Sequence, residues 1–180
     1  MPVNMKVMIA DALMKLSREK DVDKITVKDL VEECHISRQS FYYHFQDILE
    51  VIEWSTEQAF QKLLERSLET DDPEAVFRDF IVASEDANML LQKLLKSQRR
   101  EQIERLMVRY IRTYLREMIG HKGPRPDLPY EEMEVALSFC TYGIVGLLLE
   151  ANEKKPVDRD RLARQMHNLL AGRVAEKQKS

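Results

Sequence analysis

The chain has 180 residues, of which 44% are hydrophobic and 33% charged, so it can bury a core and wholesale disorder is excluded. The formal net charge of −3 excludes a globally basic protein, so any argument for nucleic-acid binding must rest on a local motif. No apolar run approaches the roughly 20 residues that span a bilayer, and Asp11 interrupts the apolar N-terminal stretch. We therefore expect a cytoplasmic protein without a secretory signal or a membrane contact.

The residues that carry chemistry are sparse and scattered. Cys34 and Cys140 lie far apart, outside any metal-ligand spacing, and are expected to be buried, reduced thiols. His121 and His167 have no partners that would complete a nucleophile, base and orienting group. We therefore expect no catalytic residues, no metal and no cofactor, and so no enzyme.

The first half of the chain has helical periodicity, and capping residues mark the starts of its helices. Residues 5–20 place apolar side chains on one face, and a charged break follows at residues 21–24. Thr26, Ser37 and Asp47 are each predicted to cap a helix, the third of which runs toward Thr70. The inward side chains of the two short helices are predicted to be Val27, Leu30, Val31, Cys34, Phe41 and Phe45.

The second half is also predicted to be helical. The sequence Asp72-Pro73 suits the start of one or two helices that continue to about Ser97. Residues 101–119 form the clearest amphipathic pattern, residues 120–129 are predicted to be a loop, and residues 130–152 form a helix that is apolar on nearly all sides. Asp158 is predicted to cap a last helix. The expected fold class is therefore all-α.

The stretch TVKDLVEECHISRQSFYYHF, residues 26–45, is typical of a helix-turn-helix. Two short helices are joined at residues 34–36, where His35 must adopt a nearly left-handed conformation. Phe41 and Phe45 would pack on the first helix and leave the second free to enter a major groove. The alternative is an ordinary helix pair within a bundle.

The second helix of this motif carries the candidate DNA contacts. Arg38 and Gln39 suit hydrogen bonds to guanine and adenine near the helix start. The later polar side chains suit phosphates, although Tyr42 alone is equally compatible with a core position. The full candidate set is Thr26, Lys28, Ser37, Arg38, Gln39, Ser40, Tyr42, Tyr43 and His44.

Within this motif the chain resembles the TetR family of regulators. The matching residues are Thr26-Val27, Ile36-Ser37, the run Phe41-Tyr42-Tyr43-His44-Phe45, and Asp47. The resemblance implies a three-helix DNA-binding head (1–46), a helical effector-binding and dimerisation body (47–180), and a two-fold dimer. The run Tyr142-Gly143-Ile144-Val145-Gly146 is similar to the subgroup that includes regulators of dihydroxyacetone kinase operons.

Two positions depart from the family pattern. His35 stands where the family commonly has Gly, and Ile48 stands where it commonly has a phosphate-binding Lys. Residues 1–46 also hold seven bases and seven acids, so a DNA-binding face must be basic by segregation of charge.

The body is expected to form the dimer and to sense an effector. A helix that is apolar all round needs a cover on every side, which a second copy supplies, unless the helix is the central core of a monomer. The predicted dimer interface comprises Gly143, Gly146, Leu147, Leu162, Met166 and Leu169. The predicted effector pocket comprises Trp54, Tyr110, Tyr114, Phe139 and Tyr142. Tyr110 and Tyr114 are also compatible with simple core positions.

The functional prediction is a sequence-specific DNA-binding transcriptional regulator, with repression favoured over activation. Its affinity for double-stranded operator DNA would be controlled by a small-molecule effector or by a partner protein. The alternative is a helical protein-interaction module without a DNA site.

Overall fold

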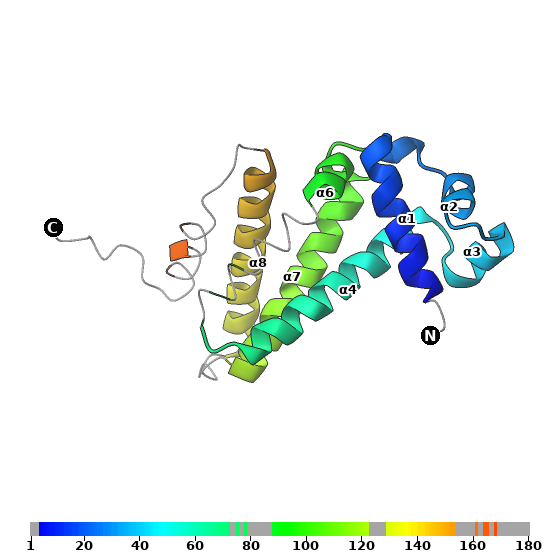
Figure 1. Cartoon of the computed structure of the whole chain (residues 1–180). Helices are drawn as coiled ribbons and strands as arrows, with labels where there is room; N and C mark the ends of the chain where they lie inside the picture. The colour runs from blue at the N-terminus through cyan, green and yellow to red at the C-terminus, as the bar shows by residue number, and fades with distance from the viewer. Residues whose placement is uncertain are drawn as a thin grey trace. The chain divides into compact units, whose positions relative to one another are not determined.

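The computed structural model describes residues 4–72, 88–122 and 129–153, together with Ala75, Arg78, Arg161, Arg164, Gln165 and Asn168. Every regular element in these residues is helical, which confirms the predicted fold class (Figure 1). The elements are α1 (Met5–Glu19), η1 (Val22–Lys24), α2 (Val27–Glu33), α3 (Arg38–His44), α4 (Ile48–Glu69), α6 (Asn88–Leu95), α7 (Arg100–Lys122) and α8 (Tyr130–Glu153).

The chain divides into two compact units, which the long helices α4 and α7 both traverse. The first unit comprises Met1–Phe60 and Ala87–Leu106, and the second comprises Gln61–Asp86 and Met107–Ser180. The predicted boundary at residue 46 falls in the short connection between α3 and α4. The first unit extends beyond that boundary because it also includes the start of α4 and all of α6.

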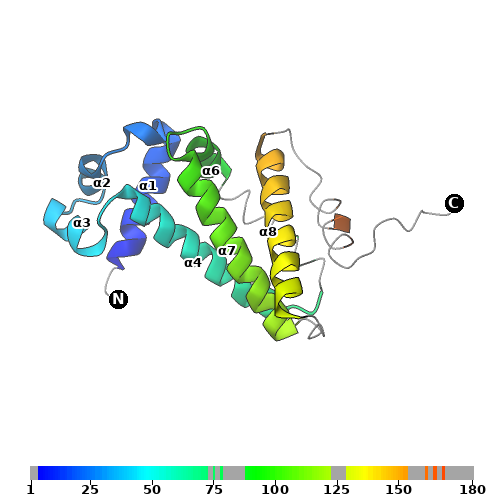
Figure 2. The ribbon, with the colours of Figure 1, turned by 180° about the vertical axis from the view of Figure 1, so that it is seen from behind.

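The core of the first unit lies where α1, α2 and α3 meet. Ile9 and Leu13 of α1, Leu30 of α2 and Phe41 of α3 are fully buried there. Figures 1 and 2 show α2 and α3 together on one side of α1. The predicted inward faces of these helices are therefore confirmed at their central positions.

The helix α6 and the turn after it attach to the end of α1 and to η1. The Lys93 ammonium donates to the carbonyl of Lys20, 3.2 Å away, and to that of Ser17. The Asp23 carboxylate accepts from the Gln98 backbone N–H at 3.1 Å and from the Arg99 guanidinium at 3.0 Å. The charged break predicted at residues 21–24 is thus an ordered 3-10 turn whose groups bind another element.

The second unit is held by α7 and α8. The buried side chains include Ile111 and Tyr114 of α7 and Leu137 and Ile144 of α8. The guanidinium groups of Arg112 and Arg116 both bind the Glu134 carboxylate, Arg116 at 2.7 Å. Arg112 is the main cause, with Arg116, of a lowered pKa at Glu134.

The end of α7 departs from the sequence prediction. The loop predicted from Gly120 starts later, because α7 continues as a helix to Lys122. A Cβ at Gly120 would meet nothing within 4 Å, so this glycine fills no structural need for close packing or a special backbone conformation. The predicted helix at residues 130–152 is confirmed as α8.

The expectation that no segment is long and apolar enough to span a membrane needs correction. Tyr130–Glu150 of α8 passes that test by length and composition, with a mean hydropathy of 1.5. The helix nevertheless carries polar groups with partners, namely Glu134 in its ion pairs and Thr141, whose buried hydroxyl donates to the Leu137 carbonyl at 2.6 Å. The core helix of a globular protein has the same signature, so the composition of α8 is weak evidence for a membrane.

Candidate nucleic-acid interface

The start of α2 is capped as the sequence predicts. The Thr26 Oγ1 accepts from the Asp29 backbone N–H at 3.3 Å, and the Asp29 carboxylate accepts from the Thr26 backbone N–H at 2.7 Å. The Lys20 ammonium also lies 2.7 Å from this carboxylate. These bonds, with that from Lys20 the largest cause, hold the pKa of Asp29 far below its usual range. The two groups therefore fix the first turn of α2.

The turn between α2 and α3 is a Schellman motif built on a non-glycine residue. His35 has a φ of 53°, the left-handed conformation that the sequence required. The Ile36 N–H donates to the Val31 carbonyl at 3.0 Å, and the His35 N–H donates to the Glu32 carbonyl at 3.3 Å. This pair of bonds closes the last turn of α2 and sets the direction of α3.

The helix α3 is fixed at its start and along one face. The Ser37 Oγ accepts from the Ser40 backbone N–H at 3.0 Å, which confirms Ser37 as the N-cap. Phe41 is fully buried, and so is Phe45, the residue that ends the helix. Their ring centroids lie 6.2 Å apart. The exposed residues of this short helix are Arg38, Gln39, Tyr42 and Tyr43.

The polar side chains of α3 lie on its outer faces. Arg38 and Gln39 are exposed, and Tyr43 has 84% of its surface accessible. Tyr42 is 56% exposed while its ring packs edge-on against Phe41, so it lies at the rim and not in the core. His44 is half-buried, and its ring meets that of Tyr43 at a centroid distance of 5.0 Å.

The other four candidate DNA contacts lie at the starts of α3 and α2. Ser37 is exposed and Ser40 is half-buried in the first turn of α3. Thr26 and Lys28 are exposed at the start of α2, where Lys28 lies 3.7 Å from Glu32.

Charge in this region is segregated as DNA binding requires. All three acids of α2 have a lysine partner: Lys15 lies 2.6 Å from Glu33, Lys20 contacts Asp29, and Lys28 contacts Glu32. The bond to Glu33 raises the pKa of Lys15. The segment Arg38–His44 contains no acid at all. Although residues 1–46 have equal numbers of acids and bases, none of the acids lies on α3.

The start of α4 differs from the family pattern in a way that the structure explains. Ile48 is 7% exposed and belongs to the core, so this position presents no cation to solvent. Asp47 accepts from the Glu50 N–H at 2.9 Å, as its predicted capping role requires, and the Glu50 carboxylate accepts from the Gln46 N–H at 2.5 Å. One residue that the sequence did not single out, Lys6, lies beside this junction.

Of the five residues of the predicted effector pocket, Phe139 and Tyr142 line one hollow, and the other three do not line it. Trp54 belongs to the first unit, where its ring packs at 6.0 Å from that of Phe45. Tyr114 is buried, and its hydroxyl donates to the Ser67 hydroxyl at 2.7 Å. Phe139 and Tyr142 are 80% and 63% exposed, because α8 turns the opposite face toward the core.

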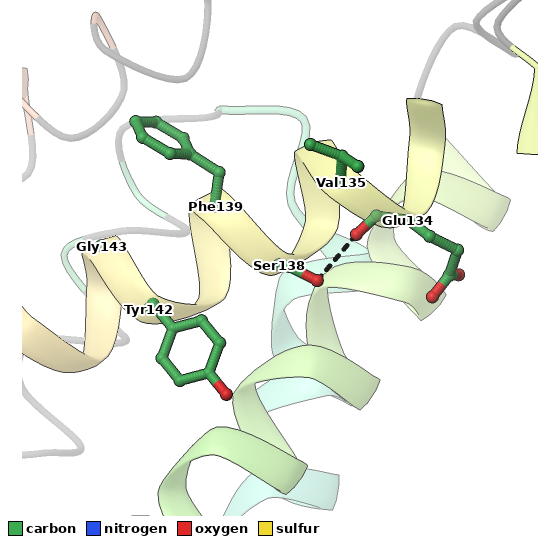
Figure 3. A pocket seen from close by; sticks show the side chains of 6 residues that line it. All are labelled: Glu134, Val135, Ser138, Phe139, Tyr142 and Gly143. Atoms are coloured by element: carbon green, nitrogen blue, oxygen red, sulfur yellow. Dashed lines mark hydrogen bonds between the residues drawn. The ribbon is translucent and has the colours of Figure 1, made fainter. Parts of the chain in front are cut away.

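The fifth residue, Tyr110, is half-buried, and the Arg109 guanidinium lies 5.1 Å from its ring centroid. An open hollow of about 620 Å³ does run along α8 (Figure 3). In Figure 3, Ser138 bonds back to the Glu134 carbonyl, while Phe139 and Tyr142 project from the helix. The hollow is lined by Glu134, Val135, Ser138, Phe139, Tyr142 and Gly143.

The predicted dimer residues are only partly described. Gly143 and Gly146 are exposed, and a Cβ on either would meet nothing within 4 Å. Leu147 is half-buried. Leu162, Met166 and Leu169 lie outside the described residues.

The two thiols and the acidic groups form no further site in the described part of the chain. Cys34 is buried, Cys140 is half-buried, and burial raises the pKa of both. Among the described residues, no group of three or more His, Cys, Asp or Glu side chains is placed to hold a metal ion.

Two family descriptions together match most of the chain. Residues 9–53 match "Bacterial regulatory proteins, tetR family", and residues 71–172 match "Transcriptional regulator C-terminal region". The curated protein "Uncharacterized HTH-type transcriptional regulator YxbF" of Bacillus subtilis is 32% identical over 53 residues. That match covers 29% of this chain and 14% of the longer relative.

Solved structures share the fold over nearly the full length. "Dihydroxyacetone kinase operon activator DhaS" has a TM-score of 0.75 at 19% identity, covering 94% of this chain and 96% of that one. Lin0861 from Listeria innocua has a TM-score of 0.69 at 19% identity, with 96% of each chain covered. The fatty acid degradation regulator FadR from Bacillus halodurans has a TM-score of 0.62 at 14% identity, covering 98% of this chain and 100% of that one. With its helix-turn-helix and both family matches, the chain belongs to the tetR family of bacterial transcriptional regulators.

Proposed function

We propose that this regulator binds operator DNA as a homodimer in which each copy places α3 in a major groove. The observation that carries the proposal is the exposure of Arg38 and Gln39 in the first turn of α3. On the inner face of the same helix, Phe41 is fully buried and fixes the helix to the core. Arg38 would donate to the O6 and N7 atoms of a guanine, and Gln39 would pair with an adenine. These two side chains would carry the sequence preference.

The remaining candidates would position the helix on the DNA backbone. Tyr42, Tyr43 and His44 present polar atoms beyond the first turn of α3, where the phosphates flank the groove. Ser37 and Ser40 would meet a phosphate at the helix start, and Thr26 and Lys28 would meet one from α2. Because every DNA sequence has the same backbone, these contacts would add affinity without selecting a sequence.

The second copy would cover the outer face of α8. Val135, Phe139 and Tyr142 expose a continuous apolar strip at helical spacing, and Gly143 and Gly146 leave open space for a close backbone approach. Pairing of this face with its own copy gives an isologous contact, to which Leu147, Leu162, Met166 and Leu169 would contribute. A two-fold dimer would also place two α3 helices on half-sites about 34–36 Å apart.

An effector acting on the second unit would control this spacing. A small-molecule ligand or a partner protein would have to bind the DNA-competent and DNA-free arrangements with different affinity. The resulting swing of one head relative to the other would prevent simultaneous docking. The proposed direction of control is repression, because a dimer seated on an overlapping promoter excludes polymerase.

The test is selection of bound duplexes from random DNA, followed by binding titrations of the selected and scrambled duplexes across salt. A recovered two-fold motif, with specific binding that persists after nonspecific binding has fallen away, supports the proposal. Equal affinity for selected and scrambled duplexes at every salt concentration would contradict it. That outcome would favour the alternative function, a helical protein-interaction module.

A further inference from the structure

The junction between α3 and α4 lacks cationic side chains of its own. The sequence contains no lysine or arginine between Arg38 and Lys62. The first turn of α4 has Asp47 and Glu50 instead, and both carboxylates cap backbone N–H groups there. A DNA backbone that approached this end of α3 would therefore meet negative charge unless another element supplied a cation.

Lys6 of α1 supplies that cation. Its ammonium lies 5.2 Å from the ring centroid of Phe45, the residue that ends α3, and 6.0 Å from the ring of Trp54 on α4. Both distances are in the range where an ammonium is attracted to an aromatic ring. The two rings also pack on each other at 6.0 Å. These ring contacts hold the ammonium of Lys6 at the junction.

Lys6 is also available to an external anion. In the described part of the chain, Lys6 has no carboxylate within ion-pair distance, whereas Lys15, Lys20 and Lys28 each have one. The side chain is half-buried, so its stem covers the rings while the ammonium remains hydrated. A phosphate could bind this ammonium without the loss of an existing ion pair.

We propose that Lys6 is a DNA-phosphate contact at the C-terminal end of α3, opposite the end that carries Arg38. This proposal rests on the proposed function, because it assumes that α3 is the recognition helix. Arg38 and Lys6 then place, at each end of the helix, one cation that has no ion-pair partner among the described residues. The contact fixes the register of α3 on the backbone and does not read bases.

The experiment compares full-length Lys6→Met with the wild type on the selected duplex and on a scrambled duplex. One lost phosphate contact should make the plot of log affinity against log salt less steep by about one unit. Affinity for both duplexes should fall about fivefold near 0.15 M salt, with the base preference unchanged. Lys6→Arg keeps the charge and the ring contact and should retain the wild-type salt slope.

The matched control is Lys15→Met, which removes the same charge from the same helix at a lysine that already has a partner. Its salt slope should equal that of the wild type. If Lys6→Met and Lys15→Met have the same slope, or if Lys6→Met and Lys6→Arg weaken binding equally with an unchanged slope, Lys6 only packs on the rings and the inference is wrong. Absence of sequence preference in the wild type would instead contradict the proposed function itself.

Discussion

The Tyr114 hydroxyl of α7 donates a hydrogen bond to the Ser67 hydroxyl of α4, 2.7 Å away, and both side chains are buried. This tyrosine is one of the five residues of the effector pocket predicted from the sequence. Its hydroxyl is already used inside the second unit, so a ligand that binds here would have to compete with Ser67. An effector at this position would therefore have to disturb the packing of the second unit.

Removal of this hydrogen bond should destabilise the protein by about 1 kcal/mol in Tyr114→Phe. Ser67→Ala removes the acceptor and should cost a similar amount. The double variant should cost less than the sum, because both changes remove one shared interaction. Urea unfolding of the four proteins measures this coupling, and strictly additive losses would show that the two hydroxyls act separately.

Replacement of Arg38 should affect sequence preference more than replacement of Tyr43. Arg38→Ala should weaken binding to the selected duplex by about 1–3 kcal/mol and relax the preference at one base pair. Tyr43→Phe should weaken all duplexes alike, since a phosphate contact carries no sequence information. Titration against a panel of single-base variants distinguishes the two effects. Unchanged preference in Arg38→Ala would rule out the docking proposed for α3.

The left-handed His35 predicts a stabilising substitution. A non-glycine residue with a φ of 53° is strained, whereas glycine adopts this conformation freely. His35→Gly should therefore raise the free energy of unfolding by up to about 1 kcal/mol, after the greater entropy of the unfolded glycine chain is included. His35→Val, which is β-branched, should lower it. Denaturant unfolding checks both signs, and equal stability of the Gly and Val variants would contradict the argument.

Asp29 should make the stability of the first unit depend on acid pH. Its pKa is lowered in the folded protein, chiefly by the bond from Lys20 and then by those from Thr26, so the unfolded chain takes up a proton first as the pH falls. The stabilisation is complete above the unfolded pKa near 3.9 and is lost progressively below it. Asp29→Asn should therefore destabilise the protein at pH 7 and progressively less below about pH 4.

Thermal unfolding across pH measures this difference. Asp11→Asn, which removes the same charge from the exposed surface of α1, is the control and should show a much smaller effect at pH 7. A constant difference between wild type and Asp29→Asn at all pH values would argue against the role of the carboxylate.

Phe139→Asp should convert the proposed dimer to a monomer. Because Phe139 is 80% exposed, the charge should leave the fold of a single copy intact while it prevents close contact of two apolar faces. Sedimentation equilibrium at micromolar concentration should then give half the wild-type mass. Val7→Asp, at another exposed apolar residue on α1, is the control and should remain dimeric. A monomeric wild type would rule out the interface.

Sequence reasoning was most accurate where the determinants are local. Thr26 and Ser37 cap helices through residues only three positions further along, and these bonds are present in the structure. The left-handed conformation of His35 follows from the short connecting segment between the two helices. Buried Phe41 and Phe45 follow from their spacing on α3. Short-range hydrogen bonds and a single apolar face can be recognised without knowledge of the remaining chain.

Only the tertiary structure decided which side of α8 faces the core and where isolated aromatic residues pack. A helix that is apolar all round has no preferred inner face, so its periodicity did not show that Phe139 and Tyr142 point outward. Likewise, the sequence did not indicate that Trp54 packs on Phe45, or that Lys6 lies over both rings. Such contacts join side chains of different elements, and their partners are chosen by how whole helices pack.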